Sequence, residues 1–244
     1  MSASLQDPRI AAGMRAQRDL RARYLREGAK QIGWKVGFGA PAAKEKLRID
    51  MPVIGFLLDR ALLPSGARVS IAGWRRPVAE AEIAAYIGAD LSDGADRATV
   101  RSAIAAIGPA IELADMDREP DDLAAVLAGD IFQRHVILGP RDESRAGAKL
   151  DELAVRVTRS GKDLPVPSDL EANTGEIVAV VQHVASVAAA LGDGVCAGQF
   201  IICGSVTAPM FLETGETGIE WTLDPIGRVS VDFAAGGAGR VRLD

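Results

Sequence analysis

The sequence is poor in the residues that build disulfide, zinc and nucleophilic sites. Its 244 residues include only two cysteines, Cys196 and Cys203, and two histidines, His135 and His183. Both cysteines stand in an apolar stretch, so we expect two buried thiols; a disulfide framework or a zinc site would need more ligands. Neither histidine is close to a serine or cysteine motif, and His183 is expected on the polar side of a helix. A nucleophile elbow, a phosphate-binding loop and a dinucleotide fingerprint are absent as well.

Positive charge and long apolar runs are also scarce. Lysine and arginine total 28 against 33 aspartate and glutamate residues, which gives a net charge of −5. A nucleic-acid-binding face would need a basic patch. No window has the length and apolarity of a transmembrane helix, and residues 1–30 lack the apolar centre of a signal peptide. We therefore predict a cytoplasmic protein with no nucleic-acid or membrane partner.

Hydrophobic residues make up 48% of the sequence, which is enough for a core. Their spacing predicts helices over residues 8–27, 42–47, 96–107, 120–127 and 176–191. It predicts strands over 33–37, 53–58, 77–87, 110–114, 134–138 and 199–203, and a hairpin of 219–223 with 228–233. Gly108-Pro109 is expected to break the third helix, and 162–173 to form a loop. Because strands and helices do not alternate regularly, an α+β fold with a mostly β core is expected.

The strand predicted over 77–87 carries two glutamates with one residue between them. Residues two apart in a strand point to the same face, so Glu80 and Glu82 would stand side by side. Ala84 continues that face, which indicates that it is partly buried. Two adjacent buried carboxylates repel each other and need a proton or a cation. The alternative is an ordinary solvated strand face.

Glu112 strengthens the cation interpretation. It is the one carboxylate in the middle of the short apolar strand predicted over 110–114. Three carboxylates from two strands, with no cysteine or histidine near them in sequence, form an oxygen-rich site that suits Mg²⁺ or Mn²⁺ rather than zinc. Glu80, Glu82 and Glu112 are the predicted metal ligands. A surface position or an ion pair is the alternative for Glu112.

Lys35 lies in the run Gly33-Trp34-Lys35-Val36-Gly37. Glycines allow a ligand to approach the backbone closely. A lysine held there could pair with a substrate carboxylate, or donate a proton if burial lowered its pKa. A strand lysine that points to water is the competing interpretation.

Three polar residues are weaker candidates for the same site. Asp130 follows Gly129 and could be catalytic or only a turn residue. Ser205 and Thr207 follow an apolar strand, and could hydrogen-bond a substrate oxygen or only satisfy the backbone of a turn.

Taken in order, these segments resemble one family. The chain is similar to the 2-keto-4-pentenoate hydratase and 4-oxalocrotonate decarboxylase group of the fumarylacetoacetate hydrolase superfamily. The segments that carry the resemblance are Gly33-Trp34-Lys35-Val36-Gly37, Pro52 with Gly55 and Leu57, Pro77 leading into Glu80-Ala81-Glu82-Ile83-Ala84, Pro109-Ala110-Ile111-Glu112-Leu113 with Asp115, and the runs 198–207 and 227–233.

The resemblance implies a mixed β-roll core with flanking helices. An N-terminal helical segment with a small α/β part would occupy 1–65 and a catalytic β-roll domain 66–244; one continuous domain is the alternative. It implies Mg²⁺ or Mn²⁺ on the three glutamates, a homo-oligomer, and Lys35 and Asp130 as catalytic residues. Lys35, Ser205 and Thr207 would bind a small 2-keto acid. A metal that chelates the carboxylate and 2-oxygen of such an acid stabilises an enolate.

Four positions depart from the pattern of this family. Phe38-Gly39-Ala40-Pro41 replaces a Thr-Ser pair, Val78 replaces an arginine, Ile131 an asparagine, and Asn173-Thr174-Gly175 a Gly-x-Pro. All four are expected to lie where substrate is contacted. None of them is a predicted metal ligand, so we expect an intact metal site and an altered substrate pocket.

The leading hypothesis is a lyase of aromatic catabolism, a hydratase before a decarboxylase. A carbon–carbon bond hydrolase of the same superfamily is a second possibility, although such enzymes use a histidine in an N-terminal lid and no histidine precedes His135. A non-catalytic partner subunit is a third, and the intact glutamates count against it.

Overall fold

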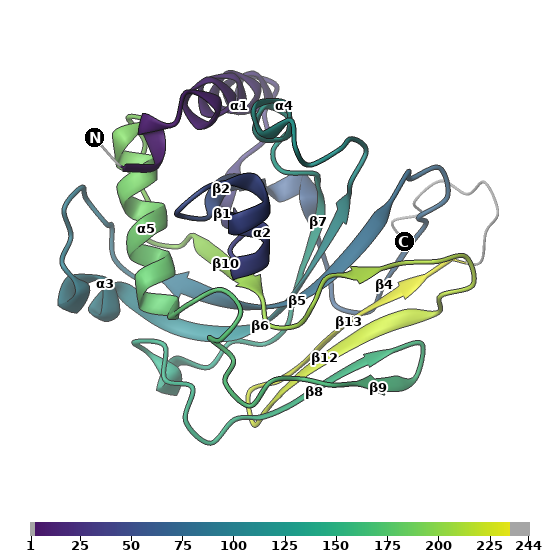
Figure 1. The fold of residues 1–244 in the computed structure, drawn as a ribbon. Coiled ribbons are helices and arrows are strands. Elements are labelled where there is room, and N and C mark those ends of the chain that lie inside the picture. The colour runs from purple at the N-terminus through teal and green to yellow at the C-terminus, as the bar shows by residue number, and fades with distance from the viewer. Residues whose placement is uncertain (1–2, 235–244) are drawn as a thin grey trace.

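The computed structural model describes residues 3–234, which form two β-sheets and the helices around them (Figure 1). The larger sheet has the strand order β2 (Val53–Leu58), β1 (Gln31–Gly37), β10 (Phe200–Ser205), β5 (Pro77–Ile87), β6 (Ile104–Asp115), β7 (Gln133–Leu138) and β3 (Leu62–Leu63), with β11 (Met210–Phe211) on one end of β5. The smaller sheet has the order β4 (Ala67–Val69), β13 (Gly227–Phe233), β12 (Gly218–Asp224), β8 (Ala154–Arg159) and β9 (Lys162–Leu164).

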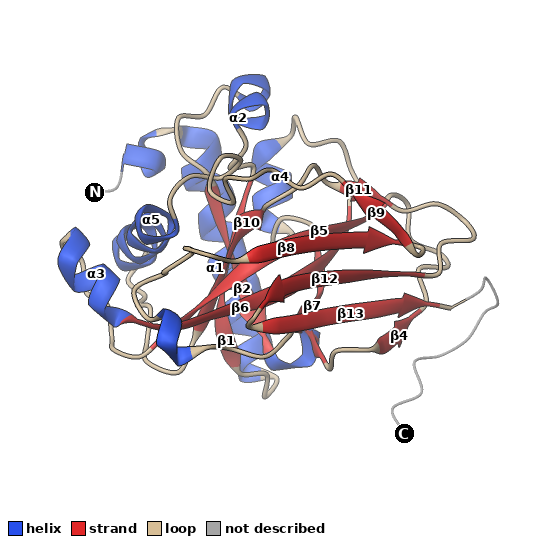
Figure 2. Cartoon of the chain, turned by 90° about the horizontal axis from the view of Figure 1, so that it is seen from below, coloured by secondary structure: helices blue, strands red, loops and turns tan. Residues whose placement is uncertain are grey.

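The helices and the smaller sheet lie on different sides of the larger sheet (Figures 1 and 2). The helices are α1 (Pro8–Arg26), α2 (Pro41–Leu47), α3 (Arg97–Ala103), α4 (Leu123–Ala128) and α5 (Ile177–Ala190). Strands β12 and β13 pack against β6. The larger sheet is mixed, because β1 and β10 are parallel while β5, β6 and β7 are antiparallel. The predicted α+β fold with a mixed β core and flanking helices is confirmed.

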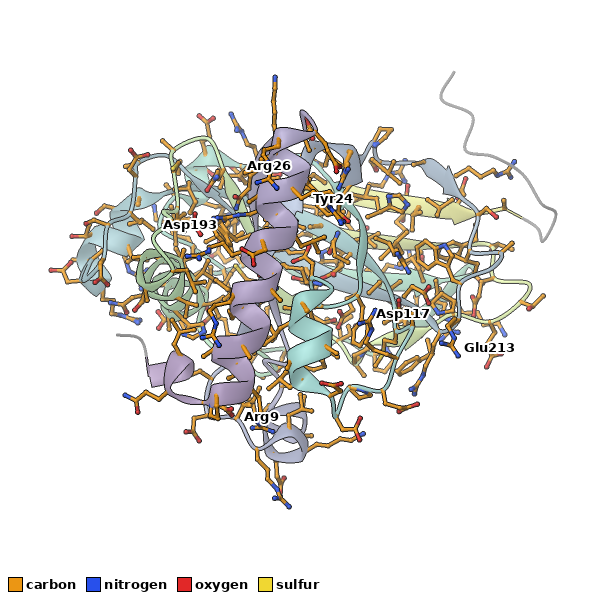
Figure 3. The ribbon with its side chains drawn as sticks, turned by 90° about the horizontal axis from the view of Figure 1, so that it is seen from above. Arg9, Tyr24, Arg26, Asp117, Asp193 and Glu213 are labelled. Carbon is orange, nitrogen blue, oxygen red and sulfur yellow. The ribbon has the colours of Figure 1, made fainter. Side chains whose placement is uncertain are left out.

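The first helix begins and ends where the sequence predicted. Asp7 caps α1 by accepting a hydrogen bond from the backbone N–H of Arg9 at 2.8 Å, and Pro8 is the first helical residue. Helix α4 lies beside α1 (Figure 3). A Cβ atom at Gly13 would come within 2.6 Å of the Leu127 Cβ, so only glycine allows this close packing. The contact fixes α4, which leads directly into the turn at Asp130.

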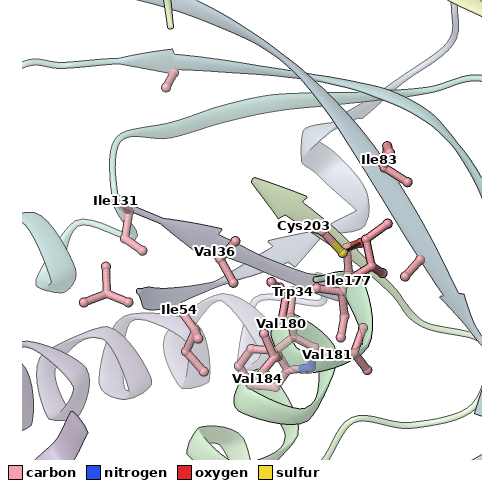
Figure 4. Close-up of a cluster of buried hydrophobic side chains, with 14 of the residues drawn as sticks. Trp34, Val36, Ile54, Ile83, Ile131, Ile177, Val180, Val181, Val184 and Cys203 are labelled. Atoms are coloured by element: carbon pink, nitrogen blue, oxygen red, sulfur yellow. Dashed lines mark hydrogen bonds between the residues drawn. The ribbon is translucent and has the colours of Figure 1, made fainter. Parts of the chain in front are cut away.

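Helix α5 covers the centre of the larger sheet with an apolar face (Figure 4). Val180, Val181 and Val184 lie against Trp34, which is buried and donates a hydrogen bond to Gln199 at 3.2 Å. The predicted polar location of His183 was wrong. Its ring is buried, and Nε2 lies 2.8 Å from the carbonyl oxygen of Pro52, because α5 is enclosed by the loop before β2 as well as by the sheet.

The helix predicted over 96–107 is only partly present. Helix α3 ends at Ala103, and Ile104 begins β6, the longest strand. Residues 104–107 pair with β5 through Ile87, Tyr86 and Ala85, so strand pairing prevails over the local helical spacing. Gly108-Pro109 lies inside β6 rather than breaking the chain.

Three smaller points complete the comparison. Cys203 is buried as predicted, whereas Cys196 is exposed. Strand β9 occupies the start of the predicted loop at 162–173. The division at residue 65 stays a prediction; at that point the chain passes from β3 of the larger sheet to β4 of the smaller one.

Within residues 3–234, none of the helices combines the length and apolarity needed to span a membrane.

Candidate metal centre

The register between β5 and β6 brings the three glutamates together. Glu80 pairs directly with Glu112 across the two strands, and Glu82 follows two residues later on the same face of β5. One carboxylate oxygen from each of the three residues lies within 4.8 Å of the other two. The side chains of Glu82 and Glu112 are each only 1% exposed, and Glu80 is half-buried. Strand pairing therefore creates a buried cluster of three carboxylates.

The glutamate face is apolar on either side of the cluster. Toward the end of β5, Ala84 and Tyr86 belong to a small core with Leu57, Val136 and Ile202. Toward its beginning, Val78 lines a cavity. Glu82 and Glu112 are thus excluded from bulk water and Glu80 is half-buried beside the cavity, so the fold does not build an ordinary solvated strand face.

Lys35 supplies positive charge to the cluster. It lies on β1 and is 2% exposed. Its Nζ donates hydrogen bonds to the Glu112 carboxylate and, at 3.1 Å, to the carbonyl oxygen of Ile131. Burial is the largest single effect and would lower the pKa of Lys35, but the charge and hydrogen bond of Glu112, together with the charges of Asp130 and Glu80, outweigh it and the pKa is raised. Lys35 is therefore a fixed cation, which favours pairing with an anion over a role that needs a lowered pKa.

The carboxylates carry more negative charge than one lysine balances. Burial, together with repulsion from Glu112, raises the pKa of Glu80 to about 7. Burial and the charges of Glu112 and Glu80 raise the pKa of Glu82 well above its ordinary value. Such shifts mean that the ionised cluster lacks positive charge.

A divalent cation would fit this donor set. Among the described residues, Glu82 Oε1 and Glu112 Oε2 are buried without a hydrogen-bond partner. Buried carboxylate oxygens are normally paired, so these two are available to an ion. All the donors are hard oxygens, as Mg²⁺ and Mn²⁺ prefer. Three ligands leave positions of an octahedral ion for water and substrate.

The backbone at the end of β10 orients Glu82. The backbone N–H of Gly204 donates to Glu82 Oε2 at 2.6 Å. Gly204 has φ of 92°, in the left-handed region, and lies where the register between β10 and β5 shifts. A Cβ there would come within 2.5 Å of Thr174 Cγ2. The indole of Trp221 holds the backbone of the same glutamate, donating to its carbonyl oxygen at 2.9 Å.

Asp130 lies next to Lys35, and both side chains pack against Gly55. It is buried, and its Oδ1 accepts a hydrogen bond from the backbone N–H of Phe56 at 2.9 Å. It begins a run with Ile131 and Phe132 in which all three residues have positive φ, a strained conformation outside glycine. A Cβ at Gly55 would come within 2.7 Å of Asp130 Oδ1 and 2.9 Å of Lys35 Cγ, so glycine makes room for both side chains.

A cavity of about 260 Å³ opens above the cluster. Lys35 and Glu80 line it, whereas Glu82 and Glu112 are buried beneath. Most of its other side chains are apolar, and its full lining is Lys35, Val36, Gly37, Phe38, Gly39, Ala40, Ala43, Lys46, Leu47, Val78, Glu80, Ala114, Met116, Pro120, Ile131, Phe132, Asn173, Thr174, Gly204, Ser205, Pro209 and Phe211. A small molecule in this cavity would meet both the lysine and the metal ligands.

The sequence profile described as fumarylacetoacetate (FAA) hydrolase C-terminal matches residues 26–234. The chain belongs to this family. The fumarylacetoacetate hydrolase relationship inferred from the ordered motifs is therefore confirmed, and the matched segment includes every residue of the cluster.

Relatives of this chain with a known activity are enzymes. The chain is 28% identical to 4-oxalocrotonate decarboxylase of Pseudomonas putida over 89% of its length and 83% of the relative. It is 26% identical to 2-keto-4-pentenoate hydratase 2 of Dechloromonas aromatica, over 86% and 81% of the two chains. The solved structure of 4-oxalocrotonate decarboxylase from Pseudomonas putida G7, complexed with magnesium and adipate, matches with a TM-score of 0.83 and 26% identity, covering 92% of this chain and 86% of the other.

The four departures from the family pattern all lie in the cavity wall. Phe38, Val78, Ile131 and the pair Asn173-Thr174 line it. These positions therefore line the cavity above the glutamates, and that substrate occupies this cavity stays a prediction.

The structure separates the two hydroxyl candidates. Ser205 lines the cavity, while its Oγ is 3.5 Å from the carbonyl oxygen of Ala81. Thr207 is buried outside the cavity wall, and its hydroxyl donates to the carbonyl oxygen of Ala208 at 3.2 Å. Asp130 is likewise absent from the wall and lies next to Lys35. Of the predicted polar residues, only Lys35, Glu80 and Ser205 reach the cavity.

The sequence interpretation missed several wall residues. Met116, Phe132 and Phe211 contribute large apolar side chains, and Lys46 of α2 contributes a cation at the mouth. Asn173 Nδ2 donates to the carbonyl oxygen of Ser205 at 2.6 Å and thereby fixes the loop before α5. Of these residues only Asn173 gave a signal, as part of the departure at 173–175; the others are ordinary apolar or exposed positions until the fold assembles them.

Proposed function

We propose that the chain is a divalent-metal-dependent lyase that acts on a small 2-keto or 2-hydroxydienoic acid, and that it adds water to the substrate as 2-keto-4-pentenoate hydratases do. The observation that carries this proposal is the cluster of Glu80, Glu82 and Glu112, with two unpaired buried oxygens, at the floor of a cavity that Lys35 also lines.

A bound Mg²⁺ or Mn²⁺ would chelate the carboxylate and 2-oxygen of the acid and stabilise negative charge on the 2-oxygen as the enolate forms. The residues of the chain do the remaining work. Lys35, kept protonated by its raised pKa, places a positive charge beside the substrate carboxylate. The carbonyl oxygen of Ile131 fixes the direction of its ammonium group. The apolar wall keeps bulk water from the reacting carbons.

A decarboxylase of the 4-oxalocrotonate type is the second candidate. Its support is the 28% identity to such an enzyme and the TM-score of 0.83 to its magnesium-bound structure. Both reactions use the same stabilised enolate, so the metal cluster serves either. Apart from Lys35 and the exposed Lys46, the side chains of the cavity wall are mainly apolar, which favours a substrate with one carboxylate, the hydratase case.

Two other readings have less support. A carbon–carbon bond hydrolase with a histidine in its N-terminal part would need a residue that the first 134 positions lack. A non-catalytic partner subunit would have no use for unpaired carboxylate oxygens beneath an open cavity.

The purified chain, supplied with Mg²⁺ or Mn²⁺, is tested against 2-hydroxypentadienoate, 4-oxalocrotonate and fumarylpyruvate. Hydration of the first supports the proposal, release of carbon dioxide from the second supports the decarboxylase, and cleavage of the third supports the hydrolase. Glu82→Gln, which removes an oxygen donor with little change of shape, should abolish turnover. Failure of the wild type to bind either metal in calorimetry overturns the proposal.

A further inference from the structure

The turn before helix α5 is closed by Glu171. Its carbonyl oxygen accepts a hydrogen bond from the backbone N–H of Gly175 at 2.8 Å, and its carboxylate accepts one from the backbone N–H of Ile177 at 2.8 Å. Asn173 and Thr174 lie within this turn, are half-buried and line the cavity above the glutamates. The turn therefore holds these two side chains in a fixed direction.

Thr174 packs against two glycines from distant parts of the chain. A Cβ at Gly204 would come within 2.5 Å of Thr174 Cγ2, and a Cβ at Gly39 within 3.4 Å of the same methyl carbon. Gly39 follows β1, whereas Gly204 belongs to β10. The methyl group of Thr174 thus lies directly on the backbone of Gly204, at a distance that any other residue at position 204 would prevent.

Asn173 holds the next part of β10. Its Nδ2 donates hydrogen bonds to the carbonyl oxygens of Ser205 at 2.6 Å and of Thr207 at 3.4 Å. The pairing register between β10 and β5 shifts between Ile202 and Ser205, so the regular ladder is interrupted here. The contacts of Asn173 and Thr174 therefore support a segment that strand pairing alone holds less firmly.

The Gly204 peptide gives the two oxygens of Glu82 different surroundings. The backbone N–H of Gly204 donates to Oε2 at 2.6 Å, whereas Oε1 is buried without a hydrogen-bond partner. A hydrogen bond to one part of a ligand side chain fixes the direction in which the other part meets a metal, and such partners strongly affect metal affinity. A displacement of Gly204 would turn the carboxylate and move Oε1 away from the other two glutamates.

We propose that Thr174 and Asn173 are positioning residues of the metal centre. By fixing the Gly204 peptide, they hold Glu82 with Oε1 directed at the ion. The inference rests on the proposed function, because it takes the ion to bind at the glutamate cluster. It adds that a turn in the cavity wall, which supplies no ligand itself, controls the metal affinity.

Amide hydrogen exchange of the intact, metal-free protein, followed by NMR, tests the contact with Gly204. Thr174→Ser removes the methyl group and keeps the hydroxyl, whereas Thr174→Val keeps a methyl group and removes the hydroxyl. We expect the Gly204 amide to exchange faster in Thr174→Ser and at the wild-type rate in Thr174→Val. The amide of the buried Leu91, which donates to the carbonyl oxygen of Val195 at 2.9 Å far from this turn, is the internal reference and should exchange at the same rate in all three proteins.

Calorimetry with Mg²⁺ measures the consequence for the cluster. Thr174→Ser should lower the Mg²⁺ affinity by about tenfold, as loss of a group that orients a metal ligand does, and Thr174→Val should restore it. Asn173→Ala removes both hydrogen bonds to β10 and should also lower the affinity. Thr222→Ser, at a half-buried threonine of β12, is the matched control and should bind Mg²⁺ as the wild type does.

The outcomes separate this inference from the proposed function. If the wild type does not bind Mg²⁺, the proposed function fails, and the exchange experiment still tests whether Thr174 holds Gly204. If Thr174→Ser and Asn173→Ala bind Mg²⁺ as tightly as the wild type, the proposed function stands and the positioning role is wrong. Equal exchange of Gly204 in every protein, or faster exchange of Gly204 and Leu91 together, would also overturn the positioning role, because the effect would then be absent or a general loss of stability.

Discussion

Glu80 and Glu112 face each other as a directly paired residue pair on β5 and β6. Like charges in that arrangement destabilise a sheet. Here Glu112 is buried and Glu80 is half-buried, and the buried Glu82 adds a third carboxylate. The arrangement is tolerable because Lys35 contacts Glu112 and because the remaining oxygens can hold a cation.

Removing a single ligand should weaken metal binding without unfolding the protein. In Glu112→Gln the amide keeps the shape of the side chain but replaces an anionic oxygen, so Mg²⁺ affinity should fall by at least about tenfold to a hundredfold, as for altered metal ligands and their partners. Calorimetry with Mg²⁺ measures this. Glu143→Gln, at an exposed glutamate outside the cluster, is the matched control and should bind as the wild type does. Equal affinity in both variants would exclude Glu112 as a ligand.

The stabilisation that metal provides should grow with pH. The folded pKa of Glu80 is raised to about 7 from an ordinary 4.5. The metal-free protein therefore loses this group's contribution to stability as pH rises from about 4.5 through 7, because the folded state must then hold an unbalanced charge. Metal binds only the ionised carboxylate, so the rise in Tm on adding Mg²⁺ should be larger at pH 8 than at pH 5.5.

Thermal melts with and without Mg²⁺ at each pH measure this difference. The lowered pKa of the buried His183 affects both samples alike and cancels. Added Na⁺ at the same ionic strength is the control and should give no pH-dependent difference. A Mg²⁺-induced rise in Tm that is the same at both pH values would contradict the raised pKa of Glu80.

Replacing Lys35 should destabilise the metal-free protein and stop catalysis. Lys35→Met keeps the length of the buried chain but leaves Glu112 without its counter-charge, which costs about 3–5 kcal/mol when one partner of a buried pair is lost. Because the carboxylates remain, Mg²⁺ should restore much of the stability while turnover stays absent. Urea melts and the substrate assay measure the two effects. Lys149→Met, at an exposed lysine, should change neither; a Lys35→Met enzyme with normal turnover would remove Lys35 from the mechanism.

Asp130 should behave as a positioning residue. Asp130→Ala removes the acceptor for the Phe56 N–H and should lower the free energy of unfolding by about 1–3 kcal/mol. Asp130→Asn keeps that acceptor and should recover the stability, while losing the charge beside Lys35 should still reduce kcat. Both variants should keep the wild-type affinity for Mg²⁺. If Asp130→Asn retained full kcat, the carboxylate charge would have no role beyond holding the turn.

The strand around Glu80 and Glu82 could be predicted because period-two alternation needs only local information. The same holds for α1, whose cap at Asp7 and stop before Gly28 are short-range signals, and for the apolar stripe of α5. The ordered motifs also identified the family and the three glutamates. The sequence thus determined the class of fold and the three glutamates of the cluster, while their role as metal ligands and the role of Lys35 stay predictions.

The tertiary structure decided what depends on contacts between distant segments. Residues 104–107 have a helical spacing, and only pairing with β5 makes them strand and aligns Glu112 with Glu80. Whether Lys35 points to water or to Glu112 is settled by β6 lying within its reach. Thr207 is separated from the cavity, and Phe211 brought into it, by the path of the chain after β10. Burial and charge pairing arise only on folding, so local sequence patterns could not predict them.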